Sequence, residues 1–127
     1  MTTRAAIRRS VDWQDTDAAG HYHHSTVVRW AEAAEAALLE ELGLIGLFGT
    51  IPRVRYEANY LSRLWFRDVV DIGIRIGEVG RTSVTYVFEV RRGDTVAVHG
   101  RMVMVNAPDP SRGATPWPQD VRDRLSV

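Results

Sequence analysis

The chain has 127 residues, of which 45% are hydrophobic and 25% are charged, and sixteen basic residues balance sixteen acidic ones. This size and composition are typical of one globular domain spanning residues 1–127. Because cysteine and lysine are both absent, disulfides, cysteine-bound metals, thiol nucleophiles, Schiff-base lysines and P-loop lysines are excluded.

The charge balance and the hydropathy also limit the partners. A neutral chain lacks the basic surplus that duplex-binding proteins usually carry. Residues Met1–Ser10 lack the apolar core of a signal peptide, and no apolar run approaches the length of a membrane span. We therefore expect a cytoplasmic protein with no nucleic-acid or membrane partner.

The first predicted elements are a strand, a loop and a long helix. Apolar residues alternate over Ala5–Trp13, with Arg9 out of phase, which indicates a strand. The polar, small-residue segment Gln14–Gly20 follows as a loop. From Ser25 to Leu42 the apolar period becomes helical. The apolar face consists of Val27, Ala31, Ala34, Leu38 and Leu42.

The ends and the composition of this helix are also informative. Ser25 or Thr26 can cap its start, and Gly43 is well placed to end it. The apolar face carries two alanines at its centre, so whatever packs there can come close. A sheet wrapped around the helix would suit such a face.

Four stretches of strict alternation follow, over residues 53–60, 70–76, 84–90 and 96–104. The short, glycine-containing connections Glu78–Arg81 and Arg92–Asp94 predict antiparallel hairpins between the last three. A proline-rich tail then leads to a last helical turn, with Val121 and Leu125 facing inward. We predict an α+β domain, with one long helix on an antiparallel sheet. Because one helix covers only part of such a sheet, we also expect dimerisation.

The segment Asp15–His24 holds two acids and three of the four histidines, just before the predicted helix. Unpaired N–H groups and the helix dipole favour negative charge at a helix start. A carboxylate, imidazoles and backbone donors together suit hydrolysis of an activated acyl group. The carboxylate would attack the carbonyl or activate water, and the amides would hold the oxyanion.

The same residues also allow other interpretations, which are structural roles, a solvated surface or a metal site. An Asp-x-Asp segment before a helix is often turn and cap chemistry. A histidine run can be a solvated surface or a metal site, although the adjacent His23 and His24 are poorly spaced for one tetrahedral ion. Each of Trp13, Trp30 and Trp65 could wall an acyl pocket or belong to a core or interface.

Two helix acids need the same comparison. Glu35 falls about 40° and Glu32 about 100° from the centre of the apolar stripe. Because a buried, unpaired carboxylate is costly, Glu35 is either partly buried with a raised pKa or reaches past the edge to water. Glu32 lies on the flank that can line a cleft. His99 lies in the polar-facing set of the last strand, where a solvated role is expected.

The segment Val11–Gly20, followed by His24, Trp30 and Glu32, resembles the 4-hydroxybenzoyl-CoA thioesterase family, which includes the YbgC-like acyl-CoA thioesterases. The resemblance covers most of the chain. Further similar segments are Tyr56–Tyr60, Phe66–Asp68, Val79–Ser83 and Thr115–Pro118.

The resemblance implies a hot-dog fold and a homodimer with two sites at its interface, paired into a homotetramer. It implies metal-independent hydrolysis of a CoA thioester, with CoA as part of the substrate and no separate cofactor. The family's catalytic aspartate falls on Asp17, as nucleophile or general base. Its oxyanion donor, a backbone N–H, falls on His24, whose imidazole is a further candidate. The helix acid that approaches the acyl group falls on Glu32.

The remaining site residues follow by position. Gly20, His21 and Glu35 are candidate substrate-binding residues beside Glu32. The candidates for holding the CoA phosphates are Arg81, Arg91 and Arg92, because arginine binds phosphate in a bidentate fork.

Three departures from the family pattern bear on the acyl group. Thr26-Val27 replaces a frequent Asn-Tyr, the loop residues 21–23 are more polar than usual, and His99-Gly100 interrupt an apolar strand. If the loop and the helix start line the pocket, their polarity favours an aromatic or functionalised acyl group.

Other functions remain open from the sequence. The same fold could serve as an acyl-carrier-protein thioesterase, with a carrier protein as partner, or as a dehydratase acting on a 3-hydroxyacyl thioester. The basic docking surface of the former and the usual histidine–acid motif of the latter are not evident. A non-catalytic acyl binder and a metal-dependent enzyme complete the alternatives.

Overall fold

The computed structural model describes residues 1–21 and 24–127. Its strands are β1 (Ala5–Ser10), β2 (Arg53–Tyr60), β3 (Val69–Val79), β4 (Ser83–Arg92) and β5 (Thr95–Val105). Its helices are α1 (His24–Glu41) and α2 (Gln119–Leu125), with short 3-10 turns η1 (Trp13–Asp15), η2 (Ile45–Leu47) and η3 (Pro110–Arg112). The predicted order of one strand, one long helix, four strands and a closing helix is confirmed.

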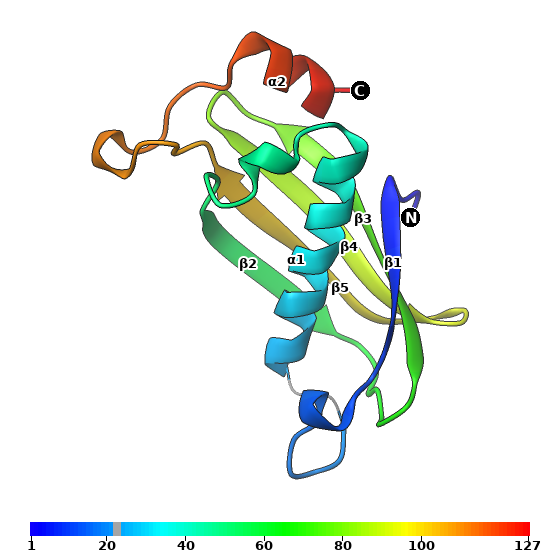
Figure 1. Cartoon of the computed structure of the whole chain (residues 1–127). Coiled ribbons are helices and arrows are strands. Elements are labelled where there is room, and N and C mark those ends of the chain that lie inside the picture. The colour runs from blue at the N-terminus through cyan, green and yellow to red at the C-terminus, as the bar shows by residue number, and fades with distance from the viewer. Residues whose placement is uncertain (22–23) are drawn as a thin grey trace.

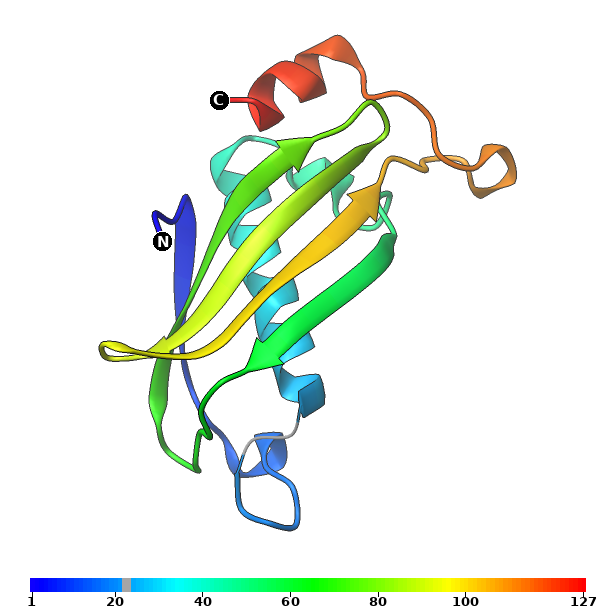
Figure 2. The ribbon, with the colours of Figure 1, turned by 180° about the vertical axis from the view of Figure 1, so that it is seen from behind.

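The strands form one antiparallel sheet in the order β1-β3-β4-β5-β2. Helix α1 lies along one face of this sheet, and the strands curve around it (Figure 1). From behind, the sheet crosses in front of α1, so the opposite face of the sheet carries no helix (Figure 2). This is the α+β arrangement that the periodicity predicted, and it agrees with the hot-dog fold that the resemblance implies.

The core lies between α1 and the sheet. Val27, Ala31, Ala34 and Leu38 are fully buried, as the helical period predicted. The alanine side chains allow close approach of helix and sheet, and protein interiors leave few voids. The sheet side of the core contains Val70, Ile72, Ile74, Tyr86, Phe88, Val90, Val98 and Met102.

Gly100 interrupts the apolar alternation of β5 for a steric reason. It pairs with Phe88 on β4 and with Ala58 on β2. A Cβ atom at this position would lie 2.5 Å from the Phe88 ring and 2.5 Å from the Glu57 carbonyl oxygen. The missing side chain therefore makes room for a core aromatic ring.

One predicted strand end and one predicted helix cap are wrong. The first strand ends at Ser10 rather than Trp13, because the chain turns into η1 and leaves Trp13 70% exposed. The helix begins at His24, so Ser25 and Thr26 lie within its first turn and do not cap it. At the other end Gly43 takes a positive φ of 72°, which agrees with its predicted role in ending the helix.

A register shift between Arg53 and Arg55 alters the predicted pattern of β2. Arg53 pairs with Met104 on β5, which faces the core, whereas Val54 is 59% exposed. The alternation had placed Val54 with Tyr56, and Arg53 on the opposite face. A bulge rotates the strand locally and re-aims a side chain, so Arg53 is brought to the helix side.

The helix-free face of the sheet is polar, with cross-strand pairs such as Arg8–Asp71 at 2.9 Å. On the central strand β4, however, Glu89 is 5% exposed and accepts a hydrogen bond from Arg91 Nε at 2.9 Å. Within the described part of the chain, no helix is both long enough and apolar enough to cross a membrane.

Candidate active site

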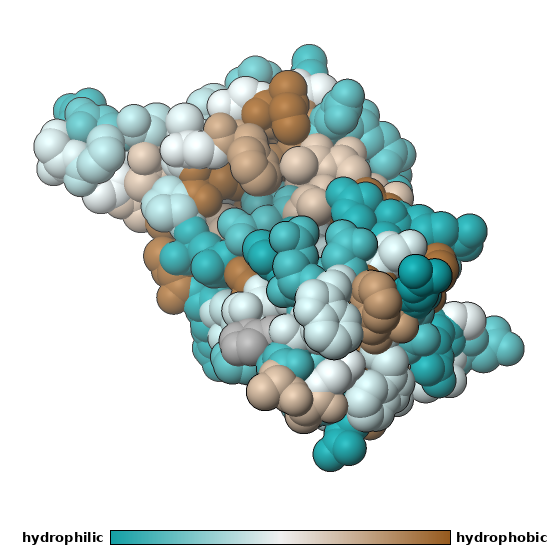
Figure 3. Space-filling model, turned by 60° about the horizontal axis from the view of Figure 1, so that its bottom comes forward, coloured by the Kyte–Doolittle hydropathy of each residue, from teal (hydrophilic) through white to brown (hydrophobic). Residues whose placement is uncertain are grey.

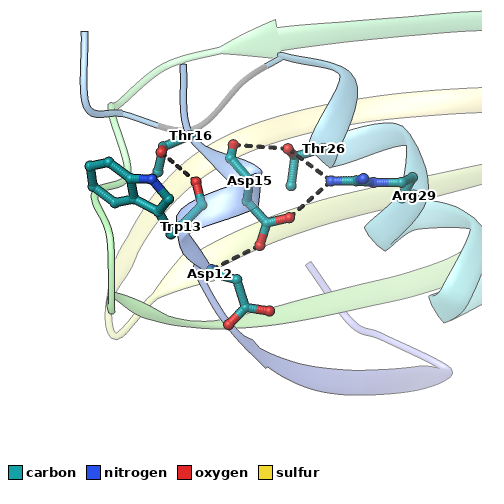
Figure 4. A network of polar contacts seen from close by, with 6 residues as sticks. All are labelled: Asp12, Trp13, Asp15, Thr16, Thr26 and Arg29. Carbon is teal, nitrogen blue, oxygen red and sulfur yellow. Dashed lines mark hydrogen bonds and ion pairs between the residues drawn. The ribbon is translucent and has the colours of Figure 1, made fainter. Parts of the chain in front are cut away.

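The loop before α1 is held by the buried carboxylate of Asp15 (Figure 4). Its Oδ2 accepts a hydrogen bond from the Asp12 N–H at 2.8 Å, and its Oδ1 accepts one from Arg29 Nη2 at 2.9 Å. The Asp15 carbonyl accepts a hydrogen bond from the Thr26 hydroxyl at 3.0 Å. We call Asp12, Asp15, Thr26 and Arg29 the Asp15 network; it ties η1 to the first turn of α1.

Asp17 lies two residues further on, in a tight turn. Its Oδ1 accepts a hydrogen bond from the Ala19 N–H at 2.8 Å, and its carbonyl accepts one from the Gly20 N–H at 3.0 Å. Gly20 has a positive φ of 88°, a conformation that favours glycine. The second carboxylate oxygen, Oδ2, lies 3.9 Å from His21 Nδ1. Of the two acids in Asp-x-Asp, Asp15 is therefore structural and Asp17 is half-exposed.

Asp17, His21 and His24 share a cavity of about 410 Å³. The other lining residues are Tyr60, Leu61, Ser62 and Arg63, from the end of β2 and the loop after it. This end of the molecule presents hydrophilic side chains mixed with weakly hydrophobic ones (Figure 3). The structure thus brings together three of the predicted site residues. Residues 60–63, which are distant in sequence, form the other wall of the cavity.

Tyr60 is a site residue that the sequence reasoning missed. Its hydroxyl donates a hydrogen bond to the His24 carbonyl at 3.0 Å and lies 3.3 Å from the Tyr56 hydroxyl. The Tyr56 ring stacks on Phe88 at 6.0 Å between centroids. The alternation of β2 predicted which face these tyrosines occupy, but their position beside the start of α1 depends on tertiary packing.

Glu32 and Glu35 line a different cavity, of about 260 Å³, beside the middle of α1 and the start of β2. Glu32 forms an ion pair with Arg53 at 3.4 Å, and its side chain is 43% exposed. Within one protomer, these two predicted substrate-binding residues are therefore separated from Asp17 and His24.

Glu35 is only 3% exposed. Of the two interpretations, burial with a raised pKa is therefore correct, and a side chain that reaches water is not. Its pKa is raised to about 7, chiefly by burial; a hydrogen-bonding contribution from Tyr86 and the charge of Arg53 oppose the shift, and the nearby Glu32 adds to it. Burial and the adjacent Glu35 also raise the pKa of Tyr86. Among the described residues, neither Glu35 Oε2 nor the Tyr86 hydroxyl has a hydrogen-bond partner of acceptable geometry.

The three predicted CoA-binding arginines do not gather at one place. Arg81 lies in the turn between β3 and β4, whereas Arg91 and Arg92 lie at the opposite end of β4. Arg91 pairs with Glu89 at 2.9 Å, and Arg92 pairs with Asp68 at 3.2 Å.

The remaining predictions concern the histidines and tryptophans. Over residues 1–21 and 24–127, no group of three or more histidine, aspartate or glutamate side chains is placed to hold a metal ion. His23, part of the metal alternative, lies outside the described residues. His99 is exposed, as expected. Trp30 belongs to the core, whereas Trp65 is 44% exposed and packs edge-on against His21.

Replacing Asp15 tests the Asp15 network. We expect Asp15→Ala to lower the free energy of unfolding by about 1–3 kcal/mol, because it leaves a backbone N–H and a guanidinium without their acceptor. Asp15→Asn, which keeps one acceptor oxygen, should cost less. Urea unfolding measures both, with Asp94→Ala as a control at an exposed turn position. Equal stability of Asp15→Ala and the wild type would contradict a structural role for this acid.

The buried Glu35 predicts a pH-dependent stability. Its pKa in the folded state, about 7, lies above its ordinary value of 4.5, so the folded state binds this proton more tightly. The resulting stability is complete below pH 4.5 and is lost as pH rises through 7, with a total of about 3 kcal/mol. The difference in unfolding free energy between wild type and Glu35→Gln should therefore shift by that amount between about pH 4.5 and 8. A pH-independent difference would refute the assignment.

The comparisons with known proteins agree with this architecture. A family model described as the thioesterase-like superfamily matches residues 11–125. A 1,4-dihydroxy-2-naphthoyl-CoA hydrolase from Prochlorococcus marinus (strain NATL1A) is 25% identical over 99 residues, which cover 68% of this chain and 66% of that protein. The chain thus spans just under two thirds of the length of this curated relative.

Two solved structures share the fold over nearly the whole chain. A thioesterase from Thermus thermophilus, complexed with coenzyme A and Zn, is 24% identical with a TM-score of 0.89, covering 99% of this chain and 100% of that one. A predicted thioesterase from Bacillus stearothermophilus is 26% identical with a TM-score of 0.87, covering 96% and 93%.

These matches do not single out the 4-hydroxybenzoyl-CoA or YbgC-like branch, which stays a prediction. The extent of the family match, from the residue after β1 to the last residue of α2, nevertheless settles the broader assignment. The chain belongs to the thioesterase-like superfamily.

Proposed function

We propose that this protein is an acyl-CoA thioesterase, which hydrolyses a CoA thioester to the free acid and CoA. The observation that carries the proposal is the common cavity of Asp17 and the start of α1. A carboxylate there faces the end of the helix where backbone N–H groups and the helix dipole favour negative charge. Membership of the superfamily and the naphthoyl-CoA hydrolase relative support it.

The reaction needs two functions on opposite sides of the thioester carbonyl. Asp17 either takes a proton from the attacking water or attacks the carbonyl carbon itself, forming an anhydride that water then opens. The backbone N–H of His24 stabilises the oxyanion of the tetrahedral intermediate. The carbon–sulfur bond breaks, and the CoA thiolate takes up a proton. The imidazole of His24 is a candidate for delivering it.

The lining of the site favours an aromatic or functionalised acyl group over a plain alkyl chain. We call the line along which β2 faces α1 the seam. The hydroxyls of Tyr56 and Tyr60 lie along the seam, and the Glu32–Arg53 ion pair lies at its other end. Because polar groups in a binding site need partners, such a seam is better matched by an acyl group with hydrogen-bonding atoms. Glu32 remains the proposed acid on the acyl side, with His21 and Gly20 shaping the entrance.

Arg63 is the best-placed residue for the CoA phosphates, because it lines the same cavity as Asp17. Arg81 stays a candidate, because it forms no ion pair within the described residues, although it lies in the turn between β3 and β4. Arg91 and Arg92 are less suited, since each is already paired with a carboxylate.

We also propose a homodimer, paired into a tetramer. Strand β2 is an edge strand of the sheet, and the exposed apolar residues Val54 and Leu61 lie on it or just after it. An open edge with apolar side chains invites pairing with another chain. Light scattering coupled to size-exclusion chromatography should give a multiple of the 14.3 kDa chain mass. A monomeric mass at micromolar concentration would contradict this part.

Replacing Asp17 tests the proposed mechanism. Asp17→Asn keeps an oxygen that can accept from the Ala19 N–H, so the turn should survive while the charge is lost. We expect kcat to fall by about 10²–10⁴, the usual contribution of a general base. Turnover is read by thiol release from aromatic, short and long acyl-CoAs, and the chain adds no thiol of its own.

Two controls sharpen this assay. Asp94→Asn, at an exposed turn away from the cavity, should retain the wild-type rate. The wild type is assayed with and without a chelator, because the proposed reaction needs no metal, and loss of turnover in its presence would refute that point. Full activity of Asp17→Asn would refute the mechanism, and no turnover of any acyl-CoA by the wild type would refute the function.

A further inference from the structure

The cavity between the middle of α1 and the start of β2 has the character of a binding site. Its walls come from four segments: α1, the loop after η2, the start of β2 and the end of β5. Phe48, Ile51, Pro52 and Met104 supply apolar surface, and Glu32, Glu35 and Arg53 supply polar groups. A mostly apolar cavity with a few convergent polar groups is the usual form of a small-molecule site.

Glu35 is the polar group that most needs a partner. It lines this cavity, is 3% exposed, and has an Oε2 with no hydrogen-bond partner among the described residues. The Tyr86 hydroxyl on β4 is close enough to Glu35 to act on its pKa through hydrogen bonding and through charge, yet in the described part of the chain this buried hydroxyl has no hydrogen-bond partner of acceptable geometry. Burying polar atoms unpaired costs free energy, so unsatisfied ones usually mark a functional site or a bound molecule.

The charges around Glu35 restrict what the cavity can accept. The groups that face it are Glu32 on the same helix, Arg53 on β2 and Tyr86 on β4. Arg53 is the cation among them, and it is already paired with Glu32 at 3.4 Å. Among these described groups no positive charge is left over for a carboxylate, whereas a neutral hydroxyl can accept a hydrogen bond from protonated Glu35 or donate one to its ionised form.

The two cavities lie along the same seam. Tyr60 lines the first and Arg53 the second, at opposite ends of β2, with Tyr56 between them. On the helix, Glu35 follows His24 by eleven residues, which is about 16 Å of axial rise. An acyl group whose carbonyl lies at His24 therefore reaches Glu35 only when it is longer than a single aromatic ring.

We propose that the cavity around Glu35 receives the distal end of the acyl group, and that Glu35 selects a neutral hydroxyl at that end. This inference rests on the proposed thioesterase function. It adds that the substrate is selected by a hydroxyl at the distal end of its acyl group. Glu35 is then a specificity residue, distant from the reacting carbonyl, and Tyr86 positions its carboxyl group.

The test compares two thioesters that differ by one hydroxyl, 10-hydroxydecanoyl-CoA and decanoyl-CoA. The wild type should prefer the hydroxylated substrate by about tenfold or more in kcat/KM, because the plain chain leaves Glu35 unsatisfied. Glu35→Met has similar bulk but no hydrogen-bonding group, and should abolish the preference, so that kcat/KM for 10-hydroxydecanoyl-CoA falls to the value for decanoyl-CoA. Glu35→Gln should keep the preference.

The pH dependence separates recognition from a purely structural role. When Glu35 is ionised, an apolar chain end beside the charged carboxylate binds less favourably. A hydroxyl can still donate a hydrogen bond to that carboxylate. The preference of the wild type should therefore grow as pH rises through 7, and that of Glu35→Gln should not. Glu40→Gln, at an exposed position further along α1, should behave as the wild type.

The outcomes distinguish this inference from the function on which it rests. Hydrolysis of both thioesters at equal rates by the wild type, or an unchanged preference in Glu35→Met, would overturn the role of Glu35 and leave the thioesterase proposal standing. No hydrolysis of any acyl-CoA would overturn both. If Glu35→Met does not fold, the pH dependence of the preference in the wild type decides: a rise supports the inference and a flat ratio overturns it.

Discussion

The position of the candidate site depends on the buried carboxylate of Asp15. It accepts hydrogen bonds from the backbone before η1 and from Arg29 one turn into α1, while its own carbonyl accepts from Thr26. These contacts join two segments that a loop would otherwise leave free to move. Asp17, two residues later, is thereby held close to the helix start. The loop conformation is determined by a side chain that takes no part in the proposed chemistry.

The second constraint is the curvature of the sheet around a helix whose buried face is rich in alanine. Ala31 and Ala34 let the sheet come close, and Gly100 leaves room for the Phe88 ring beneath it. At the β2 edge, the sheet and helix no longer pack tightly, and both cavities open along this seam. Fold and site are thus connected: the curvature that encloses the core also places β2 tyrosines opposite the start of α1.

Most of the fold could be predicted from the sequence because hydrophobic period is a local property. The alternation over four strands and the helical stripe of Val27, Ala31 and Leu38 agree with the structure. The strand end at Ser10 was missed because alternation continued to Trp13, while the chain turns into η1 after Asp12, whose N–H donates a hydrogen bond to the Asp15 carboxylate. Likewise, no local pattern marks the bulge that turns Arg53 toward Glu32.

The candidate site was predictable only in part. The Asp-x-Asp segment pointed to the correct loop, but which acid is structural follows from burial, 6% exposure for Asp15 against a half-exposed Asp17. Tyr60 and Arg63 join the cavity through strand pairing across the sheet, and the separation of Glu32 and Glu35 from Asp17 follows from helix rise. Such relations connect residues that are far apart in sequence, so periodicity does not reveal them.

The central claim is that a thioester carbonyl lies between Asp17 and the first N–H groups of α1. A crystal structure with a non-hydrolysable acyl-CoA analogue, in which a methylene group replaces the thioester sulfur, tests it most directly. The account predicts the analogue's carbonyl oxygen within hydrogen-bond distance of the His24 N–H, with the Asp17 carboxylate facing the carbonyl carbon. A carbonyl bound elsewhere, with the cavity of Asp17 and His24 empty, would contradict it.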